Sequence, residues 1–415
     1  MKESLSVRGQ SKVKEMSPLM HADFSTRDKL YDPVTRPDGY INLGTAETHL
    51  INDEVIELIY KLQNRMKLTS KHIHYDFFHG SIDFRTAIAK HWQHLIFGED
   101  TKRQLTLENV VIGAGCSLAL EMLATMLGDP GDVFLVPAPY YSGFEDDFSE
   151  RAQIELAPVN CGPTMDPAAF EAVYQAKVAE GKKVVGILYS SPNNPIGTVY
   201  TPEALKNAID FAMKYKLEIV SDEIYAETIH DSKTKWVSSY TIVPDEYLEH
   251  VHVTSSFAKD FAVSGFRTGF ALSFNLDLLK GMQNLSYYSG VSTHTQALLT
   301  EMLSAPELPE LIQMNRAALS KSYKKMEKAL NDMDVKTLPA EGGIFIFADF
   351  SAYMDDNTFE AENALWQKIF GDLKLNISPG RIFAAPTPGY FRLCYAQAEP
   401  IMDEVIRRLG TLEKK

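Results

Sequence analysis

One lysine and one arginine stand out in the mostly small and apolar stretch TSSFAKDFAVSGFRTGFALS, which spans residues 254–273. A solvent-exposed helix face would carry several charges, and a strand buried on both faces would carry none. Lysine amines form imines with aldehydes, and arginine guanidinium groups bind phosphate or carboxylate through a planar fork of N–H donors. Lys259 and Arg267 therefore indicate a site that combines carbonyl chemistry with the binding of an anion.

A glycine-rich turn is a second candidate for anion binding. The β-branched run 109–112 leads into GAGCS (113–117), where Cys116 and Ser117 begin a helical pattern. Glycines at such a turn let backbone N–H groups and a helix N-terminus face a phosphate. A dinucleotide-binding fingerprint is disfavoured, because the third glycine is missing and no acid closes a following strand at the expected distance.

Polar residues also follow two further predicted strands. The run KKVVGILY (182–189) is followed by Asn194, and the run 216–221 is followed by Asp222 and, three residues later, Tyr225. Taken alone, Asn194 could serve a simple turn, and Asp222 could cap a helix. In a parallel sheet, however, ligands bind beyond the carboxyl ends of the strands, which gathers such residues at one edge.

One cofactor uses this combination of groups: pyridoxal 5′-phosphate (PLP). It needs a lysine amine for an imine, and a carboxylate that keeps its pyridine nitrogen protonated. It also needs hydrogen bonds to its ring hydroxyl, and a cationic phosphate pocket rich in N–H donors. The sequence therefore predicts that Lys259 carries the cofactor aldehyde and that Arg267 binds the phosphate.

The elements that must position these residues alternate between strand and helix through the middle of the chain. This alternation predicts a mainly parallel central sheet with flanking helices, an α/β fold. The segment Thr201-Pro202-Glu203 is typical of a helix start, with a capping threonine, a proline and an acid. A smaller α+β lobe follows, in which the last helix is predicted over 399–415. The predicted division is an N-terminal segment that joins the small lobe (1–50), a large PLP-binding domain (51–304) and a small C-terminal domain (305–415).

Composition excludes several classes of partner. The net charge of −14 over 415 residues disfavours a nucleic-acid or anionic-membrane surface. Cys116, Cys161 and Cys394 form no CxxC or zinc pattern, so a reducing compartment is expected. The charged start lacks a secretory signal, and the most apolar window, 110–127, contains Glu121 and falls short of a membrane span. We expect a cytoplasmic protein.

Several motifs resemble those of fold-type I PLP enzymes of the class I/II aminotransferase superfamily. They include SFAK with GFRTG close behind, SPNNPIG, SDEIY and a late arginine in GYFRLCYA. Three segments are similar to those of one branch, the 1-aminocyclopropane-1-carboxylate (ACC) synthase-like proteins. These are RPDGYINLGTAETHL (36–50), VPAPYYSGFEDDF (136–148) and NTFEAENALW…LNISPG (357–380). The resemblance covers roughly residues 36–410.

The resemblance implies which residues hold the cofactor. Lys259 would be the Schiff-base lysine and the acid/base for the α-carbon, and Asp222 would pair with the pyridinium nitrogen. Asn194 and Tyr225 would bond the ring oxygen. The residues implied to hold the phosphate are Cys116, Ser117, Ser256 and Arg267.

The resemblance also implies the substrate side of the site. Tyr141, rather than Tyr140, would stack on the ring face, and Arg392 would bind the substrate α-carboxylate as a bidentate fork. Glu47 matches a glutamate that lies beside the substrate in ACC synthases. Active sites of the family form at a dimer interface, so the resemblance implies a homodimer with shared active sites.

Two positions depart from the family pattern. A tyrosine that reaches into the neighbouring subunit's site is replaced here by Phe78, unless Tyr75 substitutes for it from a shifted loop. The residue before the lysine is Ala258, as in many aminotransferases, where ACC synthases usually have serine. The nearby pair Tyr287-Tyr288 either packs in the core or forms a wall of the other subunit's site. The histidines of HIHYDFFH (72–79) lack carboxylate partners at metal-ligand spacing, so no metal site is predicted.

The implied reaction starts from an external aldimine with an amino-acid substrate, from which Lys259 removes the Cα proton. With S-adenosylmethionine the Cγ–S bond can then break, which gives ring closure to ACC or replacement at Cγ. This elimination or substitution on S-adenosylmethionine, or on a related sulfonium or thioether amino acid, ranks first. The alternatives are a class I/II aminotransferase and a cysteine-conjugate C–S lyase. A PLP-binding regulatory module fused to a DNA-binding domain is disfavoured by the negative charge and by the lack of a basic extension before residue 36.

Overall fold

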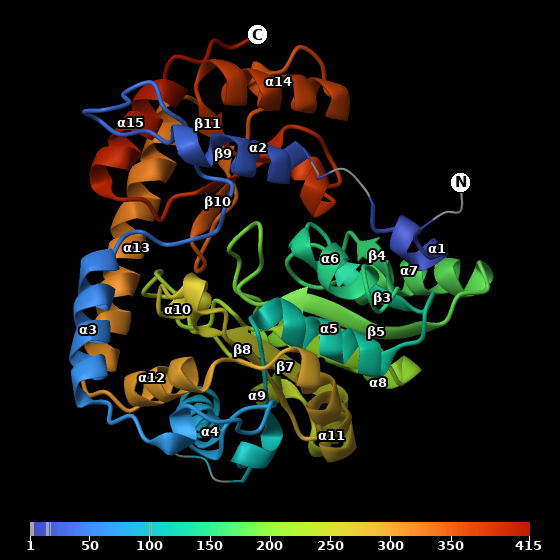
Figure 1. The fold of residues 1–415 in the computed structure, drawn as a ribbon. Coiled ribbons are helices and arrows are strands. Elements are labelled where there is room, and N and C mark those ends of the chain that lie inside the picture. Colours follow the sequence, from blue (N-terminus) through green and yellow to red (C-terminus); the bar gives the residue numbers. More distant parts are fainter. Residues whose placement is uncertain (1–3, 14–15, 17, 99, 101) are drawn as a thin grey trace.

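The computed structural model describes residues 4–13, 16, 18–98, 100 and 102–415. Its largest feature is a sheet in which β8 alone runs antiparallel to its neighbours, β2 and β7, while the other pairings are parallel (Figure 1). The predicted α/β fold with a mainly parallel sheet is confirmed. The strand order is β2 (Val110–Gly113), β8 (Gly269–Ser273), β7 (Val251–Ser256), β6 (Glu218–Asp222), β5 (Val184–Ser190), β3 (Val133–Pro137) and β4 (Glu155–Val159).

Helices cover both faces of this sheet, as its apolar strands require. Every residue of β2, β3, β5 and β7 is buried, which is typical of strands packed on both sides. Successive side chains face opposite ways, so Val110 and Ile112 join one hydrophobic cluster and Val111 joins another. The first cluster includes residues of α3 (Asn52–Arg65), α4 (Ile82–Phe97), α7 (Pro167–Ala179), α8 (Pro202–Tyr215) and α12 (Thr293–Leu303), and the second includes residues of α5 (Cys116–Leu127), α6 (Gly143–Ser149) and α11 (Leu276–Leu285).

The predicted start of α8 is confirmed in detail. Thr201 has an extended backbone, and its hydroxyl accepts a hydrogen bond from the N–H of Ala204 at 3.2 Å. Pro202 occupies the first turn, where a missing N–H costs nothing. Local sequence chemistry therefore sets where this helix begins.

A smaller lobe of helices and antiparallel strands follows α12 and lies above the large sheet in the view of Figure 1. The N-terminal segment joins it, because β1 (Ile41–Asn42) pairs in parallel with β11 (Leu375–Asn376). The domain boundaries at residues 50 and 304 stay predictions. The other elements of the lobe are α13 (Leu308–Asp332), β9 (Lys336–Thr337), β10 (Phe345–Asp349), α14 (Phe359–Asp372), β12 (Ser378–Pro379), β13 (Tyr390–Cys394) and α15 (Glu399–Leu409).

The last helix is shorter than predicted. It ends at Leu409 instead of Lys415, because Gly410, a poor helix former, follows directly. No helix among the described residues is both long and apolar enough to cross a membrane. The remaining α-helices among the described residues are α1 (Val7–Gln10), α2 (Pro18–Thr26), α9 (Ser239–Ile242) and α10 (Phe257–Asp260).

Candidate active site

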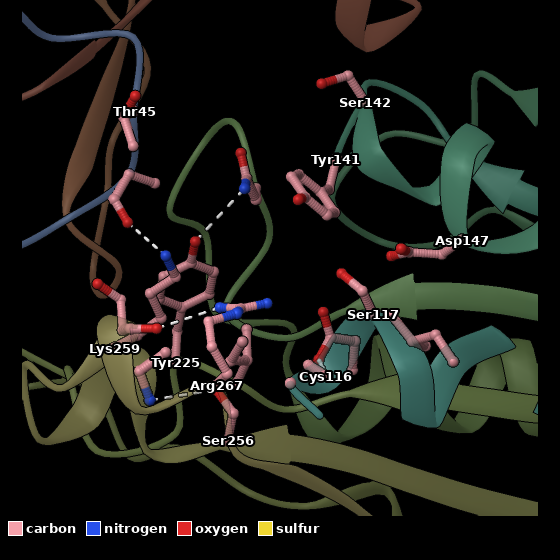
Figure 2. Close-up of a pocket in the computed structure, with 18 of the residues that line it drawn as sticks. Thr45, Cys116, Ser117, Tyr141, Ser142, Asp147, Tyr225, Ser256, Lys259 and Arg267 are labelled. Carbon is pink, nitrogen blue, oxygen red and sulfur yellow. Dashed lines mark hydrogen bonds between the residues drawn. The ribbon is translucent and has the colours of Figure 1, made fainter. Parts of the chain in front are cut away.

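A cavity of about 310 Å³ lies beyond the carboxyl ends of β2, β5, β6 and β7. Loops and helices that follow strands of the large sheet supply most of its lining, the N-terminal segment supplies residues 44–46, and the small lobe supplies Arg392. The edge predicted for ligand binding is therefore where the cavity lies. Figure 2 shows the convergence of side chains from these separate segments. The predicted site residues in its lining are Cys116, Ser117, Tyr141, Asn194, Asp222, Tyr225, Ser256, Lys259, Arg267 and Arg392.

Lys259 reaches the cavity from α10, the single turn that follows β7. Ser256 caps this turn, since its hydroxyl accepts a hydrogen bond from the N–H of Ala258 at 3.2 Å. The Lys259 ammonium donates to the carbonyl of Ala46. Burial lowers the pKa of Lys259, and the charge of Glu47 opposes this shift. A buried lysine with a lowered pKa is a better nucleophile than an exposed one.

Asp222 ends β6 and is fully enclosed at the floor of the cavity. Its Oδ1 accepts hydrogen bonds from the Cys116 thiol at 3.5 Å and the Thr254 hydroxyl at 3.2 Å. Burial raises the pKa of Asp222 to about 7 despite these donors. No ion pair involves Asp222 among the residues that the structure describes. A cationic ligand group beside it would restore the ionised carboxylate.

Asn194 and Tyr225 form a hydrogen-bonded pair on the wall of the cavity. The Asn194 Nδ2 donates to the Tyr225 hydroxyl at 3.4 Å. Burial raises the pKa of Tyr225 well above its ordinary value, so the phenol stays neutral. Both side chains can therefore donate hydrogen bonds to an oxygen atom of a ligand.

The turn before α5 lies so close to Arg267 that no side chain fits at Gly115. A Cβ atom on Gly115, whose φ is +92°, would lie 2.6 Å from Nη2 of Arg267. A Cβ atom on Gly269 would lie 2.3 Å from the backbone nitrogen of Cys116. Glycine at both positions keeps the N-terminus of α5 open beside a guanidinium, which is the arrangement that binds phosphate.

Arg392 brings a second guanidinium into the cavity from β13. Only 4% of the residue is exposed, and its guanidinium donates to the side-chain oxygen of Asn194 at 3.0 Å and to the carbonyl of Gly44. Its Nε has no partner, and the group lies 4.8 Å from the ring centre of Phe383. No carboxylate pairs with Arg392 in the described part of the chain. Because a buried cation without a counter-ion is unfavourable, Arg392 is suited to bind an anionic group of a ligand.

Two predicted residues, Glu47 and Phe78, lie outside the lining, and so does Tyr140, which was disfavoured for stacking. Glu47 is not part of the lining, but its carboxylate accepts a hydrogen bond from the lining residue Ser264. Phe78 is 39% exposed and outside this cavity, with its ring 5.2 Å from that of Tyr287. Tyr140, the less favoured stacking residue, is buried and donates to Glu145 at 2.6 Å, while Tyr141 lines the cavity.

The exposed side chains near Phe78 settle one open alternative. Tyr287 and Tyr288 are 64% and 79% exposed, so core packing within this chain is excluded for them. Tyr75 is 95% exposed and lies outside the cavity of its own chain, so its role as a substitute in a partner's site stays a prediction. The predicted link between this loop and an active site therefore depends on a second subunit.

Sequence reasoning missed Asp147, which lines the cavity from α6. Asp147 is buried, and its Oδ2 has no hydrogen-bond partner. A signal was present, because Phe144, Asp147 and Phe148 share one helix face at spacings of three and four residues. Carboxylates are seldom fully buried unless they are paired, so an aspartate on the same helix face as two phenylalanines indicates a buried polar site.

The family model for aminotransferases of class I and II matches residues 38–409 of this sequence. The chain belongs to this family. Its relatives include a 1-aminocyclopropane-1-carboxylate synthase from Nicotiana tabacum, 33% identical over 385 residues, which are 89% of this chain and 78% of that protein. Synthase 4 from Solanum lycopersicum is 33% identical over 381 residues, which are 88% of this chain and 79% of that protein.

Solved structures show the same fold at lower identity. Aspartate aminotransferase from Thermus thermophilus with maleate has a TM-score of 0.82 and 22% identity, with 99% of each chain covered. The aromatic aminotransferase from Pyrococcus horikoshii has a TM-score of 0.75 and 20% identity, with 94% of this chain and 97% of that chain covered. Members of the aminotransferase family use PLP and act on amino-acid substrates, so this chain is a PLP-dependent enzyme of that kind.

The donor set of the cavity fits this cofactor. A buried amine at Lys259 suits an aldehyde, and the buried acid Asp222 lacks a cation such as a protonated pyridine nitrogen. The open turn at Gly115 beside Arg267 suits a phosphate. The chemistry of the described residues therefore agrees with the family's cofactor.

Proposed function

We propose that this enzyme eliminates or substitutes the sulfur group of S-adenosylmethionine or of a related sulfonium or thioether amino acid. The observation that supports an amino-acid substrate is the environment of Arg392. Its guanidinium is buried in the same cavity as Lys259 and has no carboxylate partner among the described residues. A substrate α-carboxylate supplies the missing anion, which Arg392 binds with two parallel N–H donors. The sulfur chemistry is supported by the relatives that are named ACC synthases.

The roles of the cofactor residues form part of the same proposal. Asp222 holds a proton on the pyridine nitrogen, and the hydrogen bonds of Asn194 and Tyr225 orient the ring oxygen. Tyr141 packs against the ring face. The phosphate is held by Cys116, Ser117, Ser256 and Arg267. When bound, PLP accepts the electrons that the substrate's Cα–H bond releases.

Lys259 moves the Cα proton. Burial lowers the pKa of its amine, which favours the neutral form that can take a proton. The carbonyl of Ala46 accepts a hydrogen bond from the amine and orients it within the cavity. A lysine held this way can remove the proton from one face of the substrate and later return it.

Glu47 favours a substrate with positive charge beyond the amino-acid head group. Its carboxylate, bonded to Ser264, lies close enough to Lys259 to influence the pKa of the amine. A sulfonium cation near this position would be attracted by the negative charge. A neutral amino acid gains nothing from it, so Glu47 contributes to selectivity in the proposal.

Ala258 supports the second candidate, an aminotransferase. It lines the cavity directly before Lys259, where ACC synthases usually carry serine. In transamination, Lys259 would hand the proton on without the departure of a sulfur group, so no sulfonium or thioether substrate would be needed. A cysteine-conjugate C–S lyase, in which a β-thiolate leaves, stays a further alternative on the same residues.

A second copy of the chain completes the site in this proposal. The exposed aromatic residues of two loops form a cluster that we call the aromatic surface: Tyr75, Phe78, Tyr287 and Tyr288. Exposed aromatic clusters of this kind mark protein contacts. We expect a homodimer in which Phe78 borders the partner's cavity. Sedimentation that shows an active monomer would contradict this arrangement.

The experiment that tests the function is mass spectrometry of the products formed from S-adenosylmethionine by the purified, PLP-loaded protein. Methylthioadenosine together with ACC is the expected result for a synthase. Methylthioadenosine with another amino-acid product indicates elimination or substitution at Cγ with a different outcome. Unchanged S-adenosylmethionine would overturn the first proposal, and keto-acid pairs and cysteine conjugates would then distinguish the two alternatives.

A further inference from the structure

Asp147 is a buried acid at the place where the proposed function puts an anion. It lies on α6 between Phe144 and Phe148, and 8% of the residue is exposed. Figure 2 shows its carboxyl end directed towards Ser117 and Tyr141 at the cavity wall. The Asp147 Oδ2 is buried and has no hydrogen-bond partner.

An ionised carboxylate at this position conflicts with a phosphate beside Ser117. Two anions in a buried site repel each other strongly, because little water screens them. The cation of the site, Arg267, approaches from the turn at Gly115, and Asp147 forms no ion pair with described residues. A protonated carboxyl removes the conflict, since its O–H donates a hydrogen bond while its other oxygen still accepts one.

We propose that Asp147 is a protonated carboxyl that donates a hydrogen bond at the phosphate end of the cofactor, and that cofactor affinity consequently depends on pH. This inference rests on the proposed placement of the phosphate at Cys116 and Ser117. It gives a function to an oxygen atom that otherwise stays buried without a partner. It also explains how a carboxyl group can line an anion site.

The surroundings of Asp147 favour the protonated form. Burial raises the pKa of Asp147 to about 7, and among its described neighbours only the Ser117 side chain opposes this rise. A bound phosphate raises the pKa further, because it adds negative charge. The titratable groups that face Asp147 are Cys116 and Glu121 of α5, Asp222 of β6, Asp146 of its own helix, and Tyr141.

The pH dependence follows with a definite sign. Below about pH 7 the carboxyl keeps its proton and supports phosphate binding. As the pH rises through this value, Asp147 loses its proton in the protein without cofactor. Binding of the phosphate must then either be accompanied by uptake of a proton at Asp147 or place two negative charges side by side. We therefore expect the affinity for the phosphate group to fall as the pH rises.

Equilibrium binding of PLP and of pyridoxal, which lacks the phosphate, tests the inference at pH 6 and pH 8.5. The ratio of the two affinities isolates the phosphate, because both compounds share the imine and the ring. In the wild type this ratio should fall about 30-fold, since an acid with a pKa of about 7 keeps its proton in about one molecule in 30 at pH 8.5. Asp147→Asn keeps a donor without a charge, so its ratio should stay higher than that of the wild type at pH 8.5 and match it at pH 6.

Asp277→Asn is the control, because Asp277 is an exposed aspartate on α11 that is not among the groups facing Asp147. It should behave like the wild type at both pH values. Equal ratios in the wild type and Asp147→Asn at pH 8.5 would overturn the inference. An Asp147→Asn effect of the same size on pyridoxal would also overturn it, because the residue would then act on the ring.

Infrared spectroscopy gives a second test. With PLP bound at pH 8, the wild type should show a C=O stretching band of a buried protonated carboxyl that Asp147→Asn lacks, and this band should weaken when pyridoxal replaces PLP. Absence of such a band with PLP would contradict the inference. Neither experiment contains an amino-acid substrate, so failure here is distinguishable from failure of the S-adenosylmethionine proposal.

Discussion

The cavity and the aromatic surface differ in what a single chain completes. Lys259, Asp222 and Arg392 are enclosed, and each already has hydrogen-bond partners within the chain. Tyr75 and Tyr288 instead expose 95% and 79% of their surface, although aromatic side chains gain free energy when they are buried. The contrast shows that a single chain encloses the polar groups of the cavity, whereas it leaves the aromatic surface exposed, to be covered only in the proposed dimer.

The largest expected effect comes from Lys259→Ala. Loss of the amine should lower turnover by at least about 10³-fold, because covalent attachment and proton transfer fail together. The absorption band of the PLP imine should disappear while the circular dichroism spectrum stays unchanged. Lys280→Ala, at an exposed position on α11, is the control. A retained band would show that another lysine binds the cofactor.

Arg392→Lys should reduce kcat/KM by about 30- to 1,000-fold, or roughly 2–4 kcal/mol, because lysine keeps the charge but loses the bidentate fork. The loss should be absent for the binding of an amine analogue that lacks the carboxylate. Steady-state kinetics with both compounds measure this difference. Equal losses for the two would mean that Arg392 supports the fold of the cavity instead of binding the substrate.

The interior should also make stability depend on pH. Glu223 is fully buried, and burial raises its pKa to about 7, above the ordinary value of 4.5. The folded protein therefore holds a proton that the unfolded chain releases, so the free energy of unfolding falls as the pH rises from about 4.5 to 7. Glu223→Gln should remove roughly 1–3 kcal/mol of this dependence, as urea unfolding at pH 5 and pH 8 can show. An unchanged pH slope would contradict the shifted pKa.

The smallest effect is expected at the aromatic surface. Phe78→Tyr restores one hydroxyl donor, which is worth about 0.5–1.5 kcal/mol for a neutral hydrogen bond. If Phe78 borders the partner's cavity, affinity for the substrate or cofactor should rise by about 2- to 10-fold. Phe77→Tyr, at the neighbouring exposed position, serves as the control. An equal change in affinity in both variants would contradict the placement of Phe78 beside the partner's cavity.

Much of the site could be predicted because its residues directly follow strands. Asp222, Asn194 and Lys259 each come at the end of, or a few residues after, a strand with a clear apolar pattern. Parallel strands bring their carboxyl ends to one edge, so sequence order alone gathered these groups. The helix start at Thr201 was equally local and equally predictable. The family resemblance added the roles, which composition and spacing do not supply.

Other features were decided only by the tertiary structure. Arg392 enters the cavity from β13 in the other lobe, which no local pattern specifies. Asp147 became a buried acid because α6 packs its phenylalanine face on α5, and burial depends on a neighbour that lies distant in the sequence. The last helix stops at Leu409, although the apolar stripe continues to Leu412. Sequence thus determined which groups follow each strand, and long-range packing determined which of them meet, because burial and distance arise only when separate segments pack together.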